Sequence, residues 1–152
     1  MLQKIEKILW ILFIPVVIAT LYKVLPVAFI AILGLVLGMF YTVFTLFLIN
    51  GIRLGNALDS ASYRSINGLR IVGSIFLGFF YSIVPITVLF KSLHWPGAQI
   101  NLFTGIFWML VATIIALIKR KRSGEAFYKR VLKRNLFFLT ILLATLLVSI
   151  AF

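Results

Sequence analysis

The side chains that could take part in chemistry are few in this 152-residue chain, and three of them lie in one short segment. Lys91, His94 and Trp95 are close in sequence, and His94 is the only histidine. An imidazole titrates near neutral pH, so His94 could serve as a proton-linked switch or as a contact for a partner. The same residues also suit a simple turn at a membrane surface, because lysine and tryptophan favour the headgroup layer and Pro96-Gly97 reverses the chain.

Carboxylates and thiols are too scarce to build a catalytic centre around this segment. The chain has three acidic residues, Glu6, Asp59 and Glu125, and no cysteine. One histidine without cysteine cannot supply the usual ligands of a metal site. A proton relay inside a membrane needs ionisable groups at depth, and all three acids are expected near one face. The sequence therefore predicts no enzyme, no metal site and no cofactor.

The elements that carry these side chains are predicted from composition and from the length of the apolar runs. Apolar residues make up 63% of the chain, charged residues 12%, and the mean hydropathy is +1.18. Soluble domains are usually about half apolar and about a quarter charged, and a helix needs about 20 apolar residues to cross a bilayer. The sequence therefore predicts an all-α integral membrane protein with five transmembrane helices, at residues 5–22, 26–50, 71–90, 99–118 and 135–152.

The distribution of basic residues predicts the orientation of these helices. All but two of the 15 lysines and arginines fall on one side of the five-helix arrangement. Only Lys23 and Lys91 fall on the other side. Because cytoplasmic loops carry the excess of positive charge, we expect the N-terminus in the cytoplasm and the C-terminus at the periplasmic face.

A short phrase occurs twice and indicates two related hairpins. Residues 21–26 and residues 89–98 each place a lysine and a proline between two long apolar runs. Both hairpins have the same orientation, which makes them parallel rather than inverted repeats. The predicted organisation is a hairpin at 1–50, a cytoplasmic loop at 51–70, a hairpin at 71–118, a basic segment at 119–134 and a last helix at 135–152.

The second phrase resembles a known turn. Residues 90–98 read FKSLHWPGA, which is similar to the FKxxHWPGA turn of small Bacteroidetes membrane proteins related to the N-terminal transmembrane hairpin of the gliding-motility proteins GldL and PorL. The resemblance covers residues 71–118 well. It covers residues 21–26 weakly, because that phrase lacks the histidine, the tryptophan and the glycine. It implies a hairpin fold in a bacterial inner membrane.

The functional implication of this resemblance is limited to the residues that match. In the motor proteins, the lysine and the histidine of the turn act with an acidic residue of the following helix, around the transmembrane segments of a partner. Lys91 and His94 match, whereas residues 99–118 contain no acid. The resemblance therefore implies a subunit that contacts a membrane-protein partner. It does not imply a proton-driven motor. The candidate partner or switch residues are Lys91, His94, Trp95 and Lys23.

The segment 119–134 holds the densest positive charge in the chain. Residues 125–134 place apolar side chains at helical spacing among basic ones, which predicts a short amphipathic helix in the cytoplasmic interface. The expected contacts for anionic phospholipid are Lys119, Arg120, Lys121, Arg122, Lys129, Arg130, Lys133 and Arg134. A topology signal alone also accounts for this charge, and nucleic-acid binding is not expected from it.

Two functions from different classes follow from these features. The first is a non-catalytic scaffold or assembly subunit of a larger membrane complex. The alternative is a small transporter or channel for an ion or small solute, which would use the hydroxyls of Thr20, Thr42, Thr45, Ser82, Thr87, Thr104 and Thr113. The pairs Gly34/Gly38 and Ser74/Gly78 predict close helix packing, either within one chain or in a homo-oligomer.

Overall fold

The structure, a computed structural model, describes the backbone of residues 1–64 and 66–151 and the side chains of 1–64 and 66–148. Five α-helices make up most of the described chain, which contains no strand. Their bounds are α1 (Leu2–Leu21), α2 (Val27–Asn50), α3 (Gly68–Ser92), α4 (Ala98–Ser123) and α5 (Ala126–Ala151). Two 3-10 turns, η1 (Leu54–Asn56) and η2 (Ser60–Tyr63), lie between α2 and α3. The all-α prediction is therefore confirmed.

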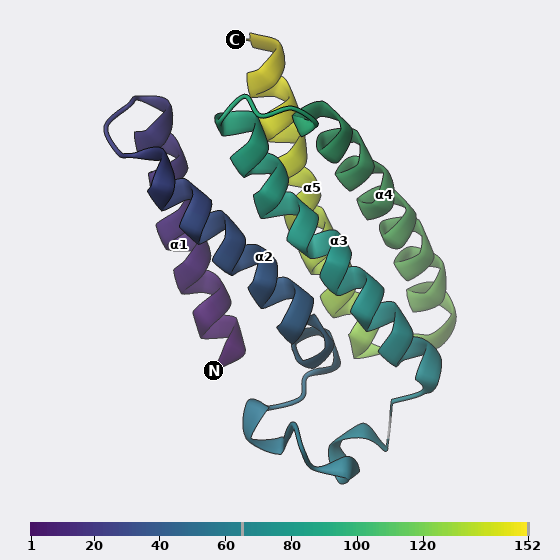
Figure 1. Ribbon diagram of the computed structural model, residues 1–152. Helices are drawn as coiled ribbons and strands as arrows, with labels where there is room; N and C mark the ends of the chain where they lie inside the picture. The colour runs from purple at the N-terminus through teal and green to yellow at the C-terminus, as the bar shows by residue number, and fades with distance from the viewer. Residues whose placement is uncertain (65, 152) are drawn as a thin grey trace.

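Successive helices run in opposite directions, so the connections gather at two ends of the bundle (Figure 1). We call one end the basic end: it holds the N-terminus, residues 51–64 and 66–67, and the α4–α5 connection. We call the other the turn end: it holds the α1–α2 and α3–α4 turns and the end of α5. Helix α3 lies at the centre, since it contacts α1, α2, α4 and α5.

Four helices, and not the five that we predicted, are long and apolar enough to cross a membrane. They are α2, α3, α4 and α5. Helix α1 differs because Lys4, Glu6 and Lys7 lie within its first two turns. Only residues 8–21 of α1 are then free of charge, which is shorter than the run of about 20 residues that a span requires. The chain is thus a multi-pass α-helical membrane protein by the length and composition of four helices.

The basic segment 119–134 is not a separate interfacial helix as predicted. Helix α4 continues to Ser123, Gly124 takes a left-handed conformation with φ of 65°, and α5 begins two residues later at Ala126. The apolar side chains of the segment pack into the bundle: Phe127, Val131 and Leu132 are each at most 5% exposed. The apolar face of this segment therefore packs against the protein. The predicted last helix ended at Phe152, which lies outside the described residues.

Small residues allow α2 and α3 to pack closely, and these contacts lie within one chain. A Cβ atom placed on Gly78 of α3 would lie 3.0 Å from the carbonyl oxygen of Tyr41 in α2. A Cβ atom on Gly34 would touch Leu89 and Phe13, and one on Gly38 would touch Ile86. The predicted glycine spacings thus serve the packing of the hairpins against each other.

We expect the Gly78→Ala variant to be destabilised, because the added methyl group would press on the α2 backbone. Overpacking of this kind costs about 1–3 kcal/mol in the free energy of unfolding. The matched control is Gly73→Ala on the same helix, where a Cβ atom meets nothing within 4 Å. Thermal unfolding in detergent measures both variants. Equal midpoints for the two would contradict the close approach of α2 and α3.

Candidate functional site

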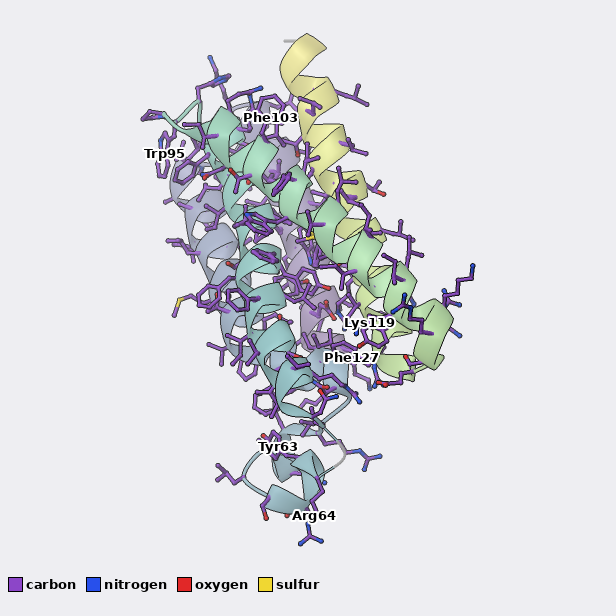
Figure 2. All side chains as sticks on the ribbon, turned by 90° about the vertical axis from the view of Figure 1, so that its right-hand side faces the viewer. Tyr63, Arg64, Trp95, Phe103, Lys119 and Phe127 are labelled. Atoms are coloured by element: carbon purple, nitrogen blue, oxygen red, sulfur yellow. The ribbon has the colours of Figure 1, made fainter. Side chains whose placement is uncertain are left out.

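The segment with Lys91, His94 and Trp95 forms the turn between α3 and α4. The Lys91 ammonium donates a hydrogen bond to Gln99 Oε1 at 2.7 Å. The Trp95 ring, which Figure 2 labels at the turn end, meets Phe90 edge to face at 5.2 Å between ring centroids. His94 and Trp95 are both exposed. The structure therefore brings the predicted residues together at the surface, where they could contact a partner.

The two turns share a backbone motif, in which Lys23 and His94 are equivalent. Each of these residues is left-handed, with φ of 58° and 52°. Val24 N–H donates to Ala19 O at 2.8 Å, and Trp95 N–H donates to Phe90 O at 2.9 Å. This 6→1 bond, with the left-handed residue before it, is the Schellman helix ending. Lys23 therefore occupies the position of His94, and not the position of Lys91 that the sequence phrase suggested.

We expect glycine at position 23 or 94 to preserve the fold and to stabilise it slightly. Glycine adopts a left-handed conformation without the strain of a Cβ atom, and the gain is up to about 1 kcal/mol in the free energy of unfolding. Lys23→Gly and His94→Gly are thus variants that remove a side chain without damaging the turn. Thermal unfolding checks this result, and a fall in either midpoint would contradict the shared motif.

A partly buried ion pair that we did not predict joins the first and last helices. Arg134 Nη2 lies 2.9 Å from Glu6 Oε2, and Arg134 Nε donates to Glu6 Oε1 at 3.1 Å. The side chains of Arg134 and Glu6 are only 13% and 15% exposed. This two-pronged geometry is the strong form of an arginine–carboxylate contact. The pair therefore places both charges at the contact between α1 and α5.

Hydrogen bonds extend from this pair into α2. The Tyr41 hydroxyl donates to Glu6 Oε1 at 3.1 Å and accepts from Trp10 Nε1 at 2.6 Å. Glu6 thus accepts bonds from two helices besides its own. Because a buried carboxylate is costly unless its oxygens are satisfied, these donors explain how an acid can remain inside the bundle.

A second set of hydrogen bonds joins α3, α4 and α5. The Tyr81 hydroxyl donates to Asn135 Oδ1 at 2.8 Å, and both side chains are 0% exposed. Asn135 Nδ2 donates to Thr113 Oγ1 at 3.2 Å, and that hydroxyl donates to Met109 O at 2.6 Å. Each polar group in this set therefore has a partner on a neighbouring helix or on its own backbone.

One aromatic side chain connects the two sets of hydrogen bonds. Phe138 is 0% exposed, and its ring centroid lies 5.1 Å from that of Tyr41 and 4.7 Å from that of Tyr81. We call the two sets together the polar network, whose members are Glu6, Trp10, Tyr41, Tyr81, Thr113, Arg134 and Asn135. All five helices contribute to it, so it ties both hairpins and α5 into one body.

At the basic end, Arg130 caps the end of α2. Its Nε donates to Ile49 O at 2.8 Å, and its Nη2 donates to Asn50 O at 3.3 Å. Gly51 closes the helix with φ of 77°, and a Cβ atom there would lie 2.9 Å from Arg130 Nη1. A cation beside the last carbonyl groups of a helix is favourable.

Two of the eight predicted lipid contacts are therefore directed into the protein. Arg130 binds backbone carbonyl groups of α2, and Arg134 binds Glu6. Sequence reasoning grouped both with the rest because they lie in the same basic run. The other six are exposed on α4 and α5: Lys119, Arg120, Lys121, Arg122, Lys129 and Lys133.

Comparison with known protein families, curated proteins and solved structures gives no match for this chain. The resemblance to the GldL and PorL turn therefore remains a prediction from residues 90–98. In the described part of the chain, no three acidic or histidine side chains gather as metal ligands would. The chemistry that the polar network offers is mutual hydrogen bonding and charge pairing between helices.

Proposed function

We propose that this chain is a non-catalytic scaffold or assembly subunit of a membrane complex in a bacterial inner membrane. The observation that carries the proposal is the polar network, which links all five helices through paired groups. A protein that moves solutes by rearranging its helices needs polar groups that exchange partners. Here the ionisable pair inside the bundle is two-pronged and also bonded to Tyr41, which favours a fixed body that holds partners.

The proposed orientation places the basic end in the cytoplasm. Exposed lysines and arginines lie at the start of α1, the end of α4 and the start of α5. All three positions belong to the basic end (Figure 1). The positive-inside rule then assigns the turn end to the periplasm. A reporter such as alkaline phosphatase is active only in the periplasm, so we expect activity when it is fused after α5 and none when it is fused within residues 51–67.

In the proposed arrangement, α1 is the fifth helix of the bundle and crosses the membrane beside α2. It lies beside α2, and its N-terminus lies at the basic end (Figure 1). Arg134 neutralises Glu6, which is the one acid of α1. Pairing lowers the cost of placing this charge beside lipid. We therefore propose that α1 crosses the membrane together with α2, although it is too charged to be recognised as a span by itself.

The proposed contact with a membrane-protein partner lies at the turn end, around Lys91, His94 and Trp95. Crosslinking in native membranes, followed by detergent pull-down of the tagged chain, tests it. We expect one stoichiometric membrane partner, and we expect Lys91→Gln and His94→Gly to reduce its recovery. The control is Lys4→Gln, which changes an exposed lysine at the start of α1, at the opposite end of the bundle. Recovery of the chain alone, or equal recovery from all variants, would count against this contact.

The six exposed basic residues of α4 and α5 are the proposed contacts for anionic phospholipid. They lie beside the end of one helix and the start of the next, where the headgroup layer is expected. Each basic residue near an anionic surface contributes about 1 kcal/mol of attraction at low salt. This attraction would orient the protein in the membrane, but it would not select a membrane-protein partner.

A transporter or channel remains the second candidate, because three buried hydroxyl groups lack a hydrogen-bond partner. They belong to Thr20, Thr45 and Thr87, which lie on α1, α2 and α3 and are at most 9% exposed. Unpaired buried hydroxyls are sites where a passing solute could bind. Flux assays in liposomes test this candidate, since the triple valine variant would abolish a flux that depends on these groups.

A further inference from the structure

An open cavity lies at the basic end, between the last turn of α2, the 51–67 segment and the first turn of α3. Its volume is about 360 Å³. Polar side chains supply most of its lining: Asn50, Arg53, Asn56, Ser62 and Arg70. Two guanidinium groups therefore share one small cavity with amide and hydroxyl groups.

Arg70 brings a guanidinium group to this cavity. Its Nη1 lies 3.1 Å from Glu125 Oε2, its Nη2 donates to Asn50 Oδ1 at 3.4 Å, and its guanidinium stacks on Phe127 at 4.7 Å. These contacts with Glu125, Asn50 and Phe127 therefore hold the guanidinium group in place at the edge of the cavity.

The charges around the cavity favour an anion. Arg53 is exposed and, within the described residues, belongs to no ion pair. Glu125 is the acid beside Arg70, and its charge is already paired there. The carbonyl groups at the end of α2 would repel an anion, but Arg130 covers two of them. Asp59 lies on the same segment but does not line the cavity, and the two charged side chains that line it are Arg53 and Arg70, so the charge of the lining is positive.

We propose that this cavity binds a phosphate group, carried either by a lipid headgroup or by free phosphate. Guanidinium groups bind phosphate oxygens through paired N–H donors. Basic pockets between membrane helices on the cytoplasmic side are suited to phospholipid headgroups. This site is distinct from the six exposed basic residues of α4 and α5. It does not depend on the scaffold function.

The test measures the thermal-unfolding midpoint of the full chain in detergent. A ligand that binds only the folded state raises the midpoint with its concentration. The probes are dioctanoyl phosphatidylglycerol, dioctanoyl phosphatidylcholine, and inorganic phosphate compared with chloride at equal ionic strength. The test variant is Arg53→Gln. The control is Arg64→Gln, an exposed arginine outside the cavity lining whose side chain extends from the tip of the same segment (Figure 2).

We expect phosphatidylglycerol, and not phosphatidylcholine, to raise the midpoint of the wild-type chain. Arg53→Gln should weaken the apparent affinity about tenfold, which is the effect of losing one charge-assisted contact, and Arg64→Gln should leave it unchanged. A response to inorganic phosphate alone with the same dependence on Arg53 also supports the site and assigns it to free phosphate. Equal weakening in the two variants, or no response to either anion, would overturn the proposal.

Discussion

Replacing Arg134 with methionine should be among the most damaging single substitutions in this chain. It would leave the partly buried Glu6 carboxylate with the Tyr41 hydroxyl as its one remaining donor from another residue. Removal of one partner from a fully buried ion pair costs about 3–5 kcal/mol, because the other charge is left uncompensated. The side chains here are 13% and 15% exposed, so we expect a loss of about 2–3 kcal/mol in the free energy of unfolding. Thermal or denaturant unfolding in detergent measures the loss. The control is Lys133→Met, which removes the charge of an exposed neighbour on the same helix.

The double variant Glu6→Gln/Arg134→Met makes this prediction specific. When both charges are removed, no uncompensated group remains, and most of the lost stability should return. A double-mutant cycle on these positions should therefore give a large coupling energy, about 2–3 kcal/mol. Additive effects of the two single substitutions would show that the pair does not hold α1 against α5.

The second large effect should follow from Phe138→Ala. Phe138 is 0% exposed and contacts the rings of Trp10, Tyr41 and Tyr81, which come from three helices. Truncating a buried phenylalanine leaves a cavity that costs about 3–5 kcal/mol. We expect a value near the lower limit, because lost packing rather than transfer from water is the main term between helices in lipid. Thermal unfolding measures this effect as well.

The control for this substitution is the neighbouring residue. Phe137 is 45% exposed and packs edge to face on Trp10 alone at 5.4 Å, apart from its neighbour Phe138. Phe137→Ala should therefore cost less than half as much as Phe138→Ala. If the two substitutions have equal effects, the centre of the bundle is not organised around Phe138.

The helical architecture could be predicted because run length and charge act locally. The predicted starts at residues 26, 71 and 99 lie within three residues of the observed first residues of α2, α3 and α4, which are Val27, Gly68 and Ala98. Whether α1 is a membrane span was harder to predict, since Lys4, Glu6 and Lys7 lower its hydropathy. The partner that neutralises Glu6 is Arg134, which lies 128 positions later. No local pattern identifies such a pair.

The absence of a local pattern also explains why the contacts of Arg130 and Arg134 were not predicted from the sequence. The spacing of Phe127 and Val131 does indicate an apolar helical face, but spacing cannot say whether that face meets lipid or protein. The structure shows that protein covers it, since both residues are at most 5% exposed. Arg130 and Arg134 follow the same face inward, where Ile49 O and Glu6 accept their hydrogen bonds. Their roles depend on tertiary contacts and not on charge density.

The turn residues show how a correct motif can be aligned incorrectly. The lysine and proline of residues 21–26 suggested that Lys23 and Lys91 are equivalent. The hydrogen bonds of the two turns instead align Lys23 with His94, because both are left-handed residues that follow the last helical turn. Backbone conformation, and not side-chain identity, is the property that the two turns share.

The most direct test of the central claim is the distance between the two hairpins at the turn end. The chain has no cysteine, so spin labels can be placed at Val24→Cys and Ile100→Cys, which are 72% and 71% exposed. Pulsed electron–electron double resonance in liposomes then measures the distribution of distances between the two spin labels. A fixed body predicts one narrow distribution that does not change with pH or ionic conditions. Two populations that exchange with those conditions would contradict a scaffold and favour a transporter.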